Sequence, residues 1–167
     1  MDITPVSNAL GANVSGIDVR SLDDSDAATL VEAWAQYGVL FFRDQKLTPD
    51  EHLTFARRFG EIDINRFFTP VDGHPEIAQV LNEPDQEHNI GGGWHTDHSY
   101  DQAPARGSIL YAREIPPIGG DTLFAGMGTA YDALSRPIKE LLGGLRAVHS
   151  GAQVFGVRTK HAEATAG

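Results

Sequence analysis

Residues 91–97 read Gly91-Gly92-Gly93-Trp94-His95-Thr96-Asp97, and this stretch carries the clearest chemical signal in the chain. The segment Trp94–Tyr100 can run as a strand, in which alternate residues share a face. His95 and Asp97 would then project side by side. An imidazole nitrogen and a carboxylate oxygen are a usual ligand pair for one metal ion. The alternative is a polar pair on a strand that binds nothing.

The spacing alone is weak evidence, because three triples of the form His-x-acid occur: His74-Pro75-Glu76, His95-Thr96-Asp97 and His161-Ala162-Glu163. His74 lies in a turn that contains a proline, and His161 lies in a small polar tail, so both are expected to be solvated. Trp94 and His98 would occupy the strand face opposite His95. We therefore expect Trp94 in the core and do not expect His98 to be a ligand.

Helical and strand signals alternate around this stretch without a linker. Apolar residues recur at helical spacing in Asp23–Tyr37 before Gly38, and Thr48-Pro49-Asp50-Glu51 has the form of a capping box that begins a second helix. A third helix is predicted over Pro137–Leu142. Short apolar runs predict strands at Val39–Phe42, Ile77–Leu81, Ser108–Arg113, Asp121–Ala125 and Leu145–His149, with a turn over Pro116–Gly120.

Composition excludes several classes of protein. The 167 residues suffice for one domain, with 41% hydrophobic residues for its core. The net charge of −10 disfavours nucleic acid and anionic membranes as partners. The absence of cysteine excludes disulfide scaffolds, thiolate zinc sites and thiol catalysis. The first residues lack the pattern of a signal peptide, and no apolar run reaches a membrane span. A cytoplasmic location is therefore expected.

Several motifs together resemble the taurine dioxygenase family, also called TauD/TfdA-like, of iron(II)/2-oxoglutarate-dependent dioxygenases. The motifs are Trp94-His95-Thr96-Asp97, Gly119-Gly120-Asp121-Thr122-Leu123-Phe124, Arg57-Arg58-Phe59-Gly60-Glu61 and Val39–Phe42 with Arg43-Asp44-Gln45. They follow in the family's order over nearly the whole chain. The resemblance implies a mainly β fold with flanking α-helices, a double-stranded β-helix (jelly roll) of the clavaminate synthase-like type.

The resemblance also implies roles for three residues. His95 and Asp97 inherit the places of two iron(II) ligands in a facial triad. Thr122 inherits a contact to a carboxylate of the co-substrate 2-oxoglutarate. The remaining positions on the metal would take 2-oxoglutarate and then O2, so the expected cofactors are Fe(II) and 2-oxoglutarate.

Two further parts of the family pattern are not identified in residues 1–167. They are a distal His that is the third ligand and an Arg that clamps 2-oxoglutarate, and both belong to strands expected after residue 167. Residues 1–167 are therefore predicted to be the front part of a single dioxygenase domain, with an incomplete jelly roll. Asn65-Arg66-Phe67-Phe68 and Gly91-Gly92-Gly93 depart from the taurine enzyme's pattern, which argues against taurine as substrate.

The leading hypothesis is an oxygenase that hydroxylates a small acidic organic substrate and releases succinate and CO2. Its partners would be that small molecule and O2, with no nucleic acid and no membrane, and a homo-oligomer is left open. The alternatives are a non-enzymatic jelly-roll module that binds a metal or ligand, and a truncated inactive homologue.

Overall fold

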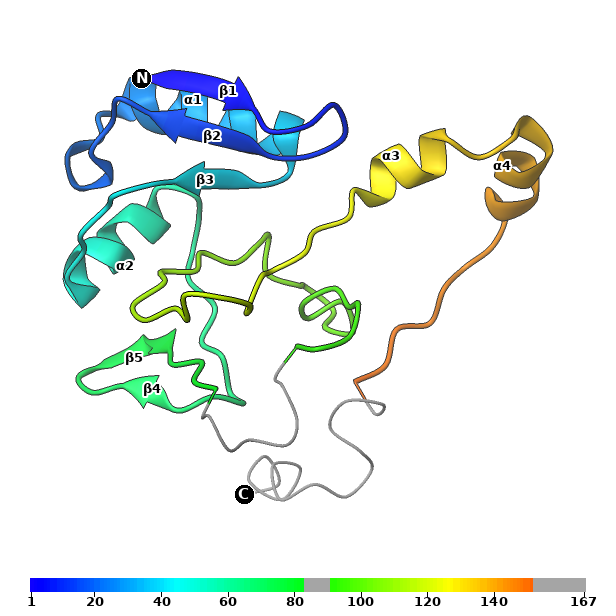
Figure 1. The fold of residues 1–167 in the computed structure, drawn as a ribbon. Coiled ribbons are helices and arrows are strands. Elements are labelled where there is room, and N and C mark those ends of the chain that lie inside the picture. The colour runs from blue at the N-terminus through cyan, green and yellow to red at the C-terminus, as the bar shows by residue number, and fades with distance from the viewer. Residues whose placement is uncertain (83–90, 152–167) are drawn as a thin grey trace. The chain divides into compact units, whose positions relative to one another are not determined.

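The computed structural model describes residues 1–82 and 91–151 (Figure 1). They divide into two compact units. The first unit comprises residues 1–59 and 110–145, and the second comprises the described residues of 60–109 and those from 146 onward. The predicted tail Thr159–Gly167, with His161, lies outside the described residues.

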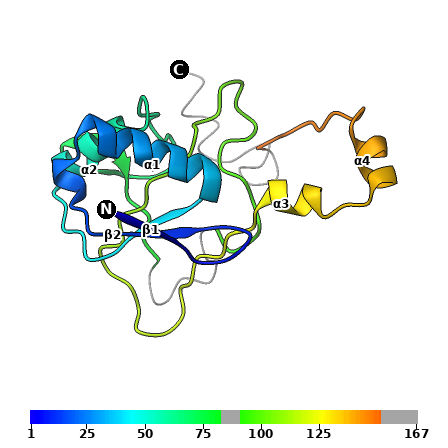
Figure 2. The same ribbon diagram turned by 90° about the horizontal axis from the view of Figure 1, so that it is seen from above.

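The first unit is built on a three-stranded sheet with the order β1-β2-β3. Its strands are β1 (Asp2–Pro5), β2 (Ala12–Ser15) and β3 (Leu40–Phe42). Strands β1 and β2 are antiparallel, and Ile3 pairs with Val14. Strands β2 and β3 are parallel, so the chain must cross over between them, and helix α1 (Asp24–Tyr37) makes this crossover. Figures 1 and 2 both show α1 lying along one face of the sheet.

Helix α1 confirms the helix predicted from apolar periodicity. Asp23 is the N-cap, and its carboxylate accepts the backbone N–H of Asp26 at 2.8 Å. Gly38 ends the helix with φ +72°, a conformation that suits glycine. A Cβ at Gly38 would lie 2.7 Å from Leu10 Cδ1, so a larger residue would displace Leu10.

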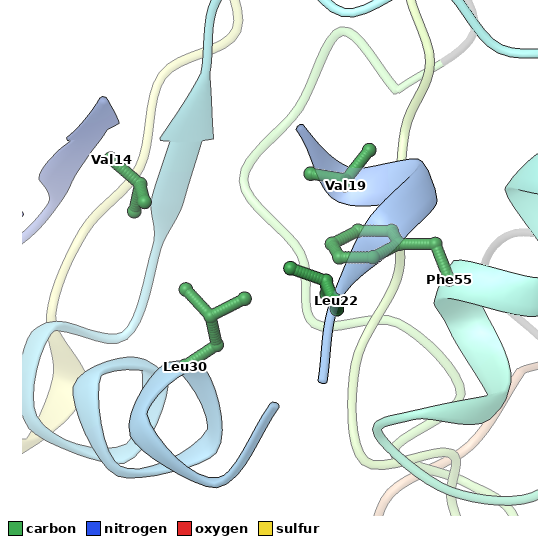
Figure 3. Packing of buried hydrophobic residues seen from close by; sticks show 5 residues of the cluster. All are labelled: Val14, Val19, Leu22, Leu30 and Phe55. Carbon is green, nitrogen blue, oxygen red and sulfur yellow. The ribbon is translucent and has the colours of Figure 1, made fainter. Parts of the chain in front are cut away.

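The core of this unit joins the sheet to both neighbouring helices. Figure 3 shows five buried side chains that converge from β2, the 3-10 helix η1 (Val19–Ser21) and its C-cap, α1, and α2 (Pro49–Arg57). They are Val14, Val19, Leu22, Leu30 and Phe55. Leu30 is fully buried. Burial of a side chain of this kind contributes roughly 1.5–3 kcal/mol to the free energy of unfolding.

Residues 110–145 are tied to the same unit by a few contacts. The Tyr111 hydroxyl accepts the backbone N–H of Leu47 at 3.1 Å, and the Phe124 ring meets Phe41 edge-on. Helix α3 (Met127–Asp132) follows Phe124 along the chain, and its Thr129 hydroxyl donates to the carbonyl of Ala9 at 3.2 Å. Helix α4 (Arg136–Leu142) follows and confirms the helix predicted there.

The second unit contains a hairpin of β4 (Pro70–Val71) and β5 (His74–Ala78), joined by a turn at Gly73 with φ +74°. The predicted strand Ile77–Leu81 shares only its first two residues, 77 and 78, with β5. None of the helices in residues 1–82 and 91–151 is long and apolar enough to cross a membrane.

Several predicted strands are wrong. Residues 108–113, 121–125 and 145–149 carry no strand, and residues 97–100 form a turn. Each stretch has strand-like residues, but a strand also requires a neighbouring backbone to pair with. Within the described part of the chain these stretches have no such ladder. The structure thus combines small sheets and helices, and a jelly roll of which residues 1–167 form the front part stays a prediction.

Candidate metal centre

His95 and Asp97 converge in the second unit, although not on a strand. Residues 94–96 are irregular, and Asp97 begins the turn over residues 97–100. The Nε2 atom of His95 lies 3.2 Å from Oδ1 of Asp97. Their side chains are 53% and 59% exposed, so both ligand atoms are open to an incoming ion.

Outer contacts orient both side chains. Nδ1 of His95 lies 2.8 Å from the carbonyl oxygen of Gly93. Since a carbonyl oxygen only accepts, Nδ1 carries a proton, and Nε2 presents its lone pair when the ring is neutral. The Ser108 hydroxyl donates to Oδ2 of Asp97 at 3.0 Å and leaves Oδ1 toward His95.

This arrangement sets two electron-pair donors, Nε2 and Oδ1, against each other. Such a contact is repulsive unless a positive charge lies between the two atoms, either a proton on Nε2 or a metal ion. Ligand atoms about 2.0–2.2 Å from one ion and at right angles to each other lie about 3 Å apart. The observed 3.2 Å matches that separation, and one imidazole with one carboxylate suits iron(II). The residues therefore fit a metal ion.

The turn after Asp97 is held by a second histidine. His98 has φ +52°, and its carbonyl accepts the backbone N–H of Asp101 at 2.9 Å. Its Nδ1 lies 2.9 Å from Oδ2 of Asp101, and its Nε2 lies 3.4 Å from the Nδ2 amide nitrogen of Asn65. Because residues 97–100 are a turn, the expectation that His98 occupies an opposite strand face is wrong.

Negative charge gathers beside this turn. Burial raises the pKa of the Tyr100 phenol, and the nearby carboxylates of Asp101 and Asp97 raise it further. The Tyr100 ring also stacks on His98, with ring centroids 5.8 Å apart. Tyr100 is therefore held neutral beside the candidate ligands at physiological pH.

Thr122 belongs to the first unit, where it lies on the exposed segment between the Gly119-Gly120 turn and α3. Both glycines have positive φ, +80° and +73°, and the chain bends at residues 117 and 118, within the predicted turn. Phe124, two residues on, attaches the segment to Phe41. The pair that the structure brings together is thus His95 with Asp97.

Two other expectations can be compared with the structure. The prediction that Trp94 lies in the core is wrong: its side chain is 72% exposed, because no strand turns it toward an interior. The prediction that His74 lies in a turn is wrong: the turn ends at Gly73, and His74 begins β5, where it pairs with Val71. Its Nδ1 lies 3.0 Å from the carbonyl of Asp72. His74 thus repeats the contact of His95 to the carbonyl two residues earlier.

Sequence reasoning missed the residues that orient the ligands. Ser108 is eleven residues from Asp97, and nothing in its local sequence links the two. Asn65 and His98 are 33 residues apart. The side-chain oxygen Oδ1 of Asn65 also accepts the backbone N–H of Phe67 at 2.8 Å. Asn commonly forms this local motif, so its presence in the sequence could have suggested the contact.

A family model described as taurine catabolism dioxygenase TauD, TfdA family matches residues 2–166. The (S)-phenoxypropionate/alpha-ketoglutarate-dioxygenase of Sphingobium herbicidovorans is 36% identical over 152 residues, which cover 89% of this chain and 53% of that protein. The alpha-ketoglutarate-dependent 2,4-dichlorophenoxyacetate dioxygenase of Cupriavidus pinatubonensis is 35% identical, over 87% of this chain and 56% of that protein. The chain spans about half the length of these curated relatives.

Solved structures agree with the family match. The structure of AAD-2 in complex with Mn(II) and N-oxalylglycine superposes with a TM-score of 0.76 and 32% identity, over 98% of this chain and 64% of that chain. A taurine dioxygenase from Burkholderia xenovorans gives a TM-score of 0.70 and 37% identity, over 89% of this chain and 52% of that chain.

Proposed function

The chain belongs to the TauD/TfdA family of dioxygenases, and on that premise we propose that the whole protein is an iron(II)- and 2-oxoglutarate-dependent oxygenase. It would hydroxylate a small acidic organic molecule. One atom of O2 enters the substrate as a hydroxyl group, and the other enters succinate as 2-oxoglutarate loses CO2. A cytoplasmic location and a homo-oligomer stay predictions.

The main observation in support of the proposal is that Nε2 of His95 lies 3.2 Å from Oδ1 of Asp97. We assign these atoms as two ligands of iron(II). When bound, iron(II) together with 2-oxoglutarate supplies the oxidising chemistry. The chain itself orients the ligands: the Gly93 carbonyl fixes the ring of His95, and the Ser108 hydroxyl fixes the carboxylate of Asp97.

The proposal needs further groups around the metal. Thr122 would donate its hydroxyl to a carboxylate of 2-oxoglutarate. The distal His and the clamping Arg of the family pattern would come from outside residues 1–167, which is consistent with a chain that spans about half the length of its relatives. Residues 1–167 would then be the front part of one jelly-roll domain.

The names of the relatives support an acidic substrate class. They are dioxygenases of phenoxypropionate, of 2,4-dichlorophenoxyacetate and of sulfonates, all of which carry an anionic group. We therefore propose a small organic carboxylate or sulfonate as the substrate of this protein.

Substitution of the two ligands in the full-length protein tests the assignment. His95→Ala and Asp97→Ala are each expected to weaken metal binding severely and to abolish succinate formation, while the thermal unfolding midpoint changes little because both side chains are exposed. Binding is measured anaerobically with Co(II), and turnover is measured as succinate. His74→Ala is the matched control, since His74 makes the same type of carbonyl contact.

Two results would contradict the proposal. Normal metal binding in both ligand variants would remove His95 and Asp97 from the metal centre. Tight metal binding in the wild type without succinate formation, tested over a panel of carboxylates and sulfonates, would favour the alternative of a non-enzymatic binding module.

A further inference from the structure

His98 adopts a backbone conformation that is uncommon for residues other than glycine. Within the described residues, His98 and Asp44 are the non-glycine residues with positive φ, and His98 has φ +52°. The Cβ of an L-residue is crowded in this left-handed region. Such a conformation persists when its surroundings impose it, and it is often found beside functional groups. His98 follows Asp97 directly.

The surroundings of His98 do impose it. The side chain is 20% exposed, and both ring nitrogens have partners: Nδ1 donates to Oδ2 of Asp101, and Nε2 accepts from the Asn65 amide. The ring stacks on Tyr100 and lies against Phe67, with centroids 5.8 and 6.2 Å away. A neutral imidazole with one donor and one acceptor satisfies both polar partners at once.

Asn65 connects this ring to a second segment. Its Oδ1 atom accepts the backbone N–H groups of Phe67 and Phe68 at 2.8 and 3.3 Å. Its amide nitrogen reaches Nε2 of His98 at 3.4 Å. One side chain therefore holds the loop over residues 65–68 and the turn over residues 97–100 together.

We propose that His98 is a positioning residue that holds the Asp97 turn, so that Oδ1 of Asp97 faces Nε2 of His95, and that it couples this metal ligand to the loop over residues 65–68. The inference rests on the proposed function, because it gives His98 a task at the metal centre. His98 itself does not touch the ion; it acts through the backbone of Asp97 and through Asn65.

A different role is conceivable for the same ring. Ligand atoms of Asp63, His98 and Asp101 lie within 4.8 Å of one another, a grouping that could hold a cation. Nδ1 of His98 donates to Asp101 and Nε2 accepts from Asn65, however, so neither ring nitrogen has a lone pair left for an ion. The positioning role therefore has the stronger support, and a second ion is an outcome that the experiment must detect.

The test uses the full-length protein and four substitutions at His98 and Asn65, together with reference variants at other residues. His98→Ala removes the ring and leaves a Cβ in the left-handed conformation, and His98→Gly relieves that conformation but also removes the ring. His98→Asn is the conservative variant, because asparagine tolerates positive φ and its amide can donate to Asp101. Asn65→Asp keeps the oxygen that accepts from Phe67 and Phe68 and removes the amide donor to His98.

Anaerobic Co(II) titration is followed by the visible d–d absorption, whose position reports the ligand geometry. His98→Ala and His98→Gly are expected to weaken Co(II) binding about 10- to 100-fold and to shift the band. His98→Asn is expected to restore binding to within about threefold, and Asn65→Asp to weaken it about threefold or more. In turnover assays of His98→Ala and His98→Gly, we expect kcat to fall and the Michaelis constant for the co-substrate to rise. The fall in kcat should be the larger factor. His74→Ala should match the wild type.

The outcomes separate this inference from the proposed function. If His95→Ala abolishes Co(II) binding while His98→Ala and His98→Gly keep the wild-type affinity and band, the positioning role is overturned and the metal centre stands. If His95→Ala also leaves binding unchanged, the metal centre itself fails. Two bound Co(II) ions in the wild type, with one lost in both His98→Ala and Asp63→Ala, would overturn positioning in favour of a second metal site.

Discussion

The two carboxylate oxygens of Asp97 have different partners. Oδ2 accepts the hydroxyl of Ser108 at 3.0 Å, and Oδ1 faces His95. A carboxylate with one oxygen fixed loses most of its freedom to rotate, so the second oxygen is presented in one direction. Hydrogen bonds of this kind commonly tune the affinity of a metal site.

Removal of the Ser108 hydroxyl should therefore weaken the site without destroying it. In Ser108→Ala we expect the Kd for Co(II) to rise about tenfold, since the ligands remain but Asp97 is less well oriented. Isothermal titration of the full-length protein measures this change. The control is Ser21→Ala, which removes another exposed hydroxyl contact, 3.3 Å to the carbonyl of Asp18. Equal affinity in the two variants would contradict the role of Ser108.

The hydroxyl of Thr122 should matter for 2-oxoglutarate and not for the metal. A hydrogen bond to a charged group contributes about 1.5–3 kcal/mol, which corresponds to roughly a ten- to hundredfold change in affinity. Thr122→Val keeps the β-branched shape, so only this bond is lost. The metal-to-ligand absorption of the anaerobic iron(II) complex gives the midpoint for 2-oxoglutarate. An unchanged midpoint, as expected for the control Thr4→Val on β1, would leave Thr122 with a structural role only.

At the residue scale, the sequence identifies the candidate ligands better than it predicts the contacts that hold them in place. The spacing of His95 and Asp97 predicts that they lie together on a strand. They do lie together, but on an irregular segment that leads into a turn. Ser108 escapes prediction, because a single hydrogen bond over eleven residues has no signature in spacing. The contact between Asn65 and His98 depends on how two loops fold back, which composition does not determine.

Among the elements, α2 has the most complete local signal. The Thr48 hydroxyl accepts the backbone N–H of Glu51 at 3.3 Å, and the Glu51 carboxylate accepts the backbone N–H of Thr48 at 2.8 Å. These reciprocal bonds form the predicted capping box. The bonds from Thr48 also lower the pKa of the Glu51 carboxyl, which therefore stays charged near the positive end of the helix dipole.

Loss of this cap should destabilise the first unit. Thr48→Ala is expected to reduce the free energy of unfolding by about 1 kcal/mol, because the N–H of Glu51 loses its acceptor. It should also raise the pKa of Glu51 toward its ordinary value. Urea unfolding measures the first effect, and NMR titration measures the second. Thr54→Ala is the matched control, since the Thr54 hydroxyl only donates to the carbonyl of Asp50 within the helix.

Helices are predicted well and strands poorly, for one physical reason. The N-caps and apolar periodicity of α1 and α2 lie in or directly beside the helices themselves, so a single segment contains the evidence. Helix α3 is not predicted, and its N-cap, Gly126, has no side chain that could cap it. A strand is completed by another segment, as β2 is completed by β1 on one side and β3 on the other. Residues 108–113 and 121–125 have the right composition, yet they form no ladder within the described part of the chain.

At the scale of the whole chain, large apolar side chains stand in solvent in both compact units. Among residues 1–82 and 91–151, six of them are more than 70% exposed: Trp94, Leu110, Ile115, Ile118, Leu123 and Val148. Scattered apolar residues are normal on a surface, but this many nearly uncovered large ones favour association with other apolar surfaces.

A polypeptide of residues 1–167 produced by itself is therefore expected to bind the dye ANS and to self-associate. Fluorescence and sedimentation velocity measure these properties. The full-length protein should bind less dye per mole, because the proposed remainder of the domain would cover part of this surface. A monomeric 1–167 polypeptide with no dye binding would contradict the expectation.

The exposure of Trp94 has an optical consequence. The chain contains two tryptophans, one in each compact unit. Trp34 is half-buried on α1, where its indole N–H donates to the carbonyl of Gly38 and its ring meets Phe59 edge-on. Trp94 stands in water beside His95, so its emission lies further to the red, and a paramagnetic ion at His95 would quench it. The protein thus carries one fluorophore that reports on its core and another that would report on a metal ion bound at His95.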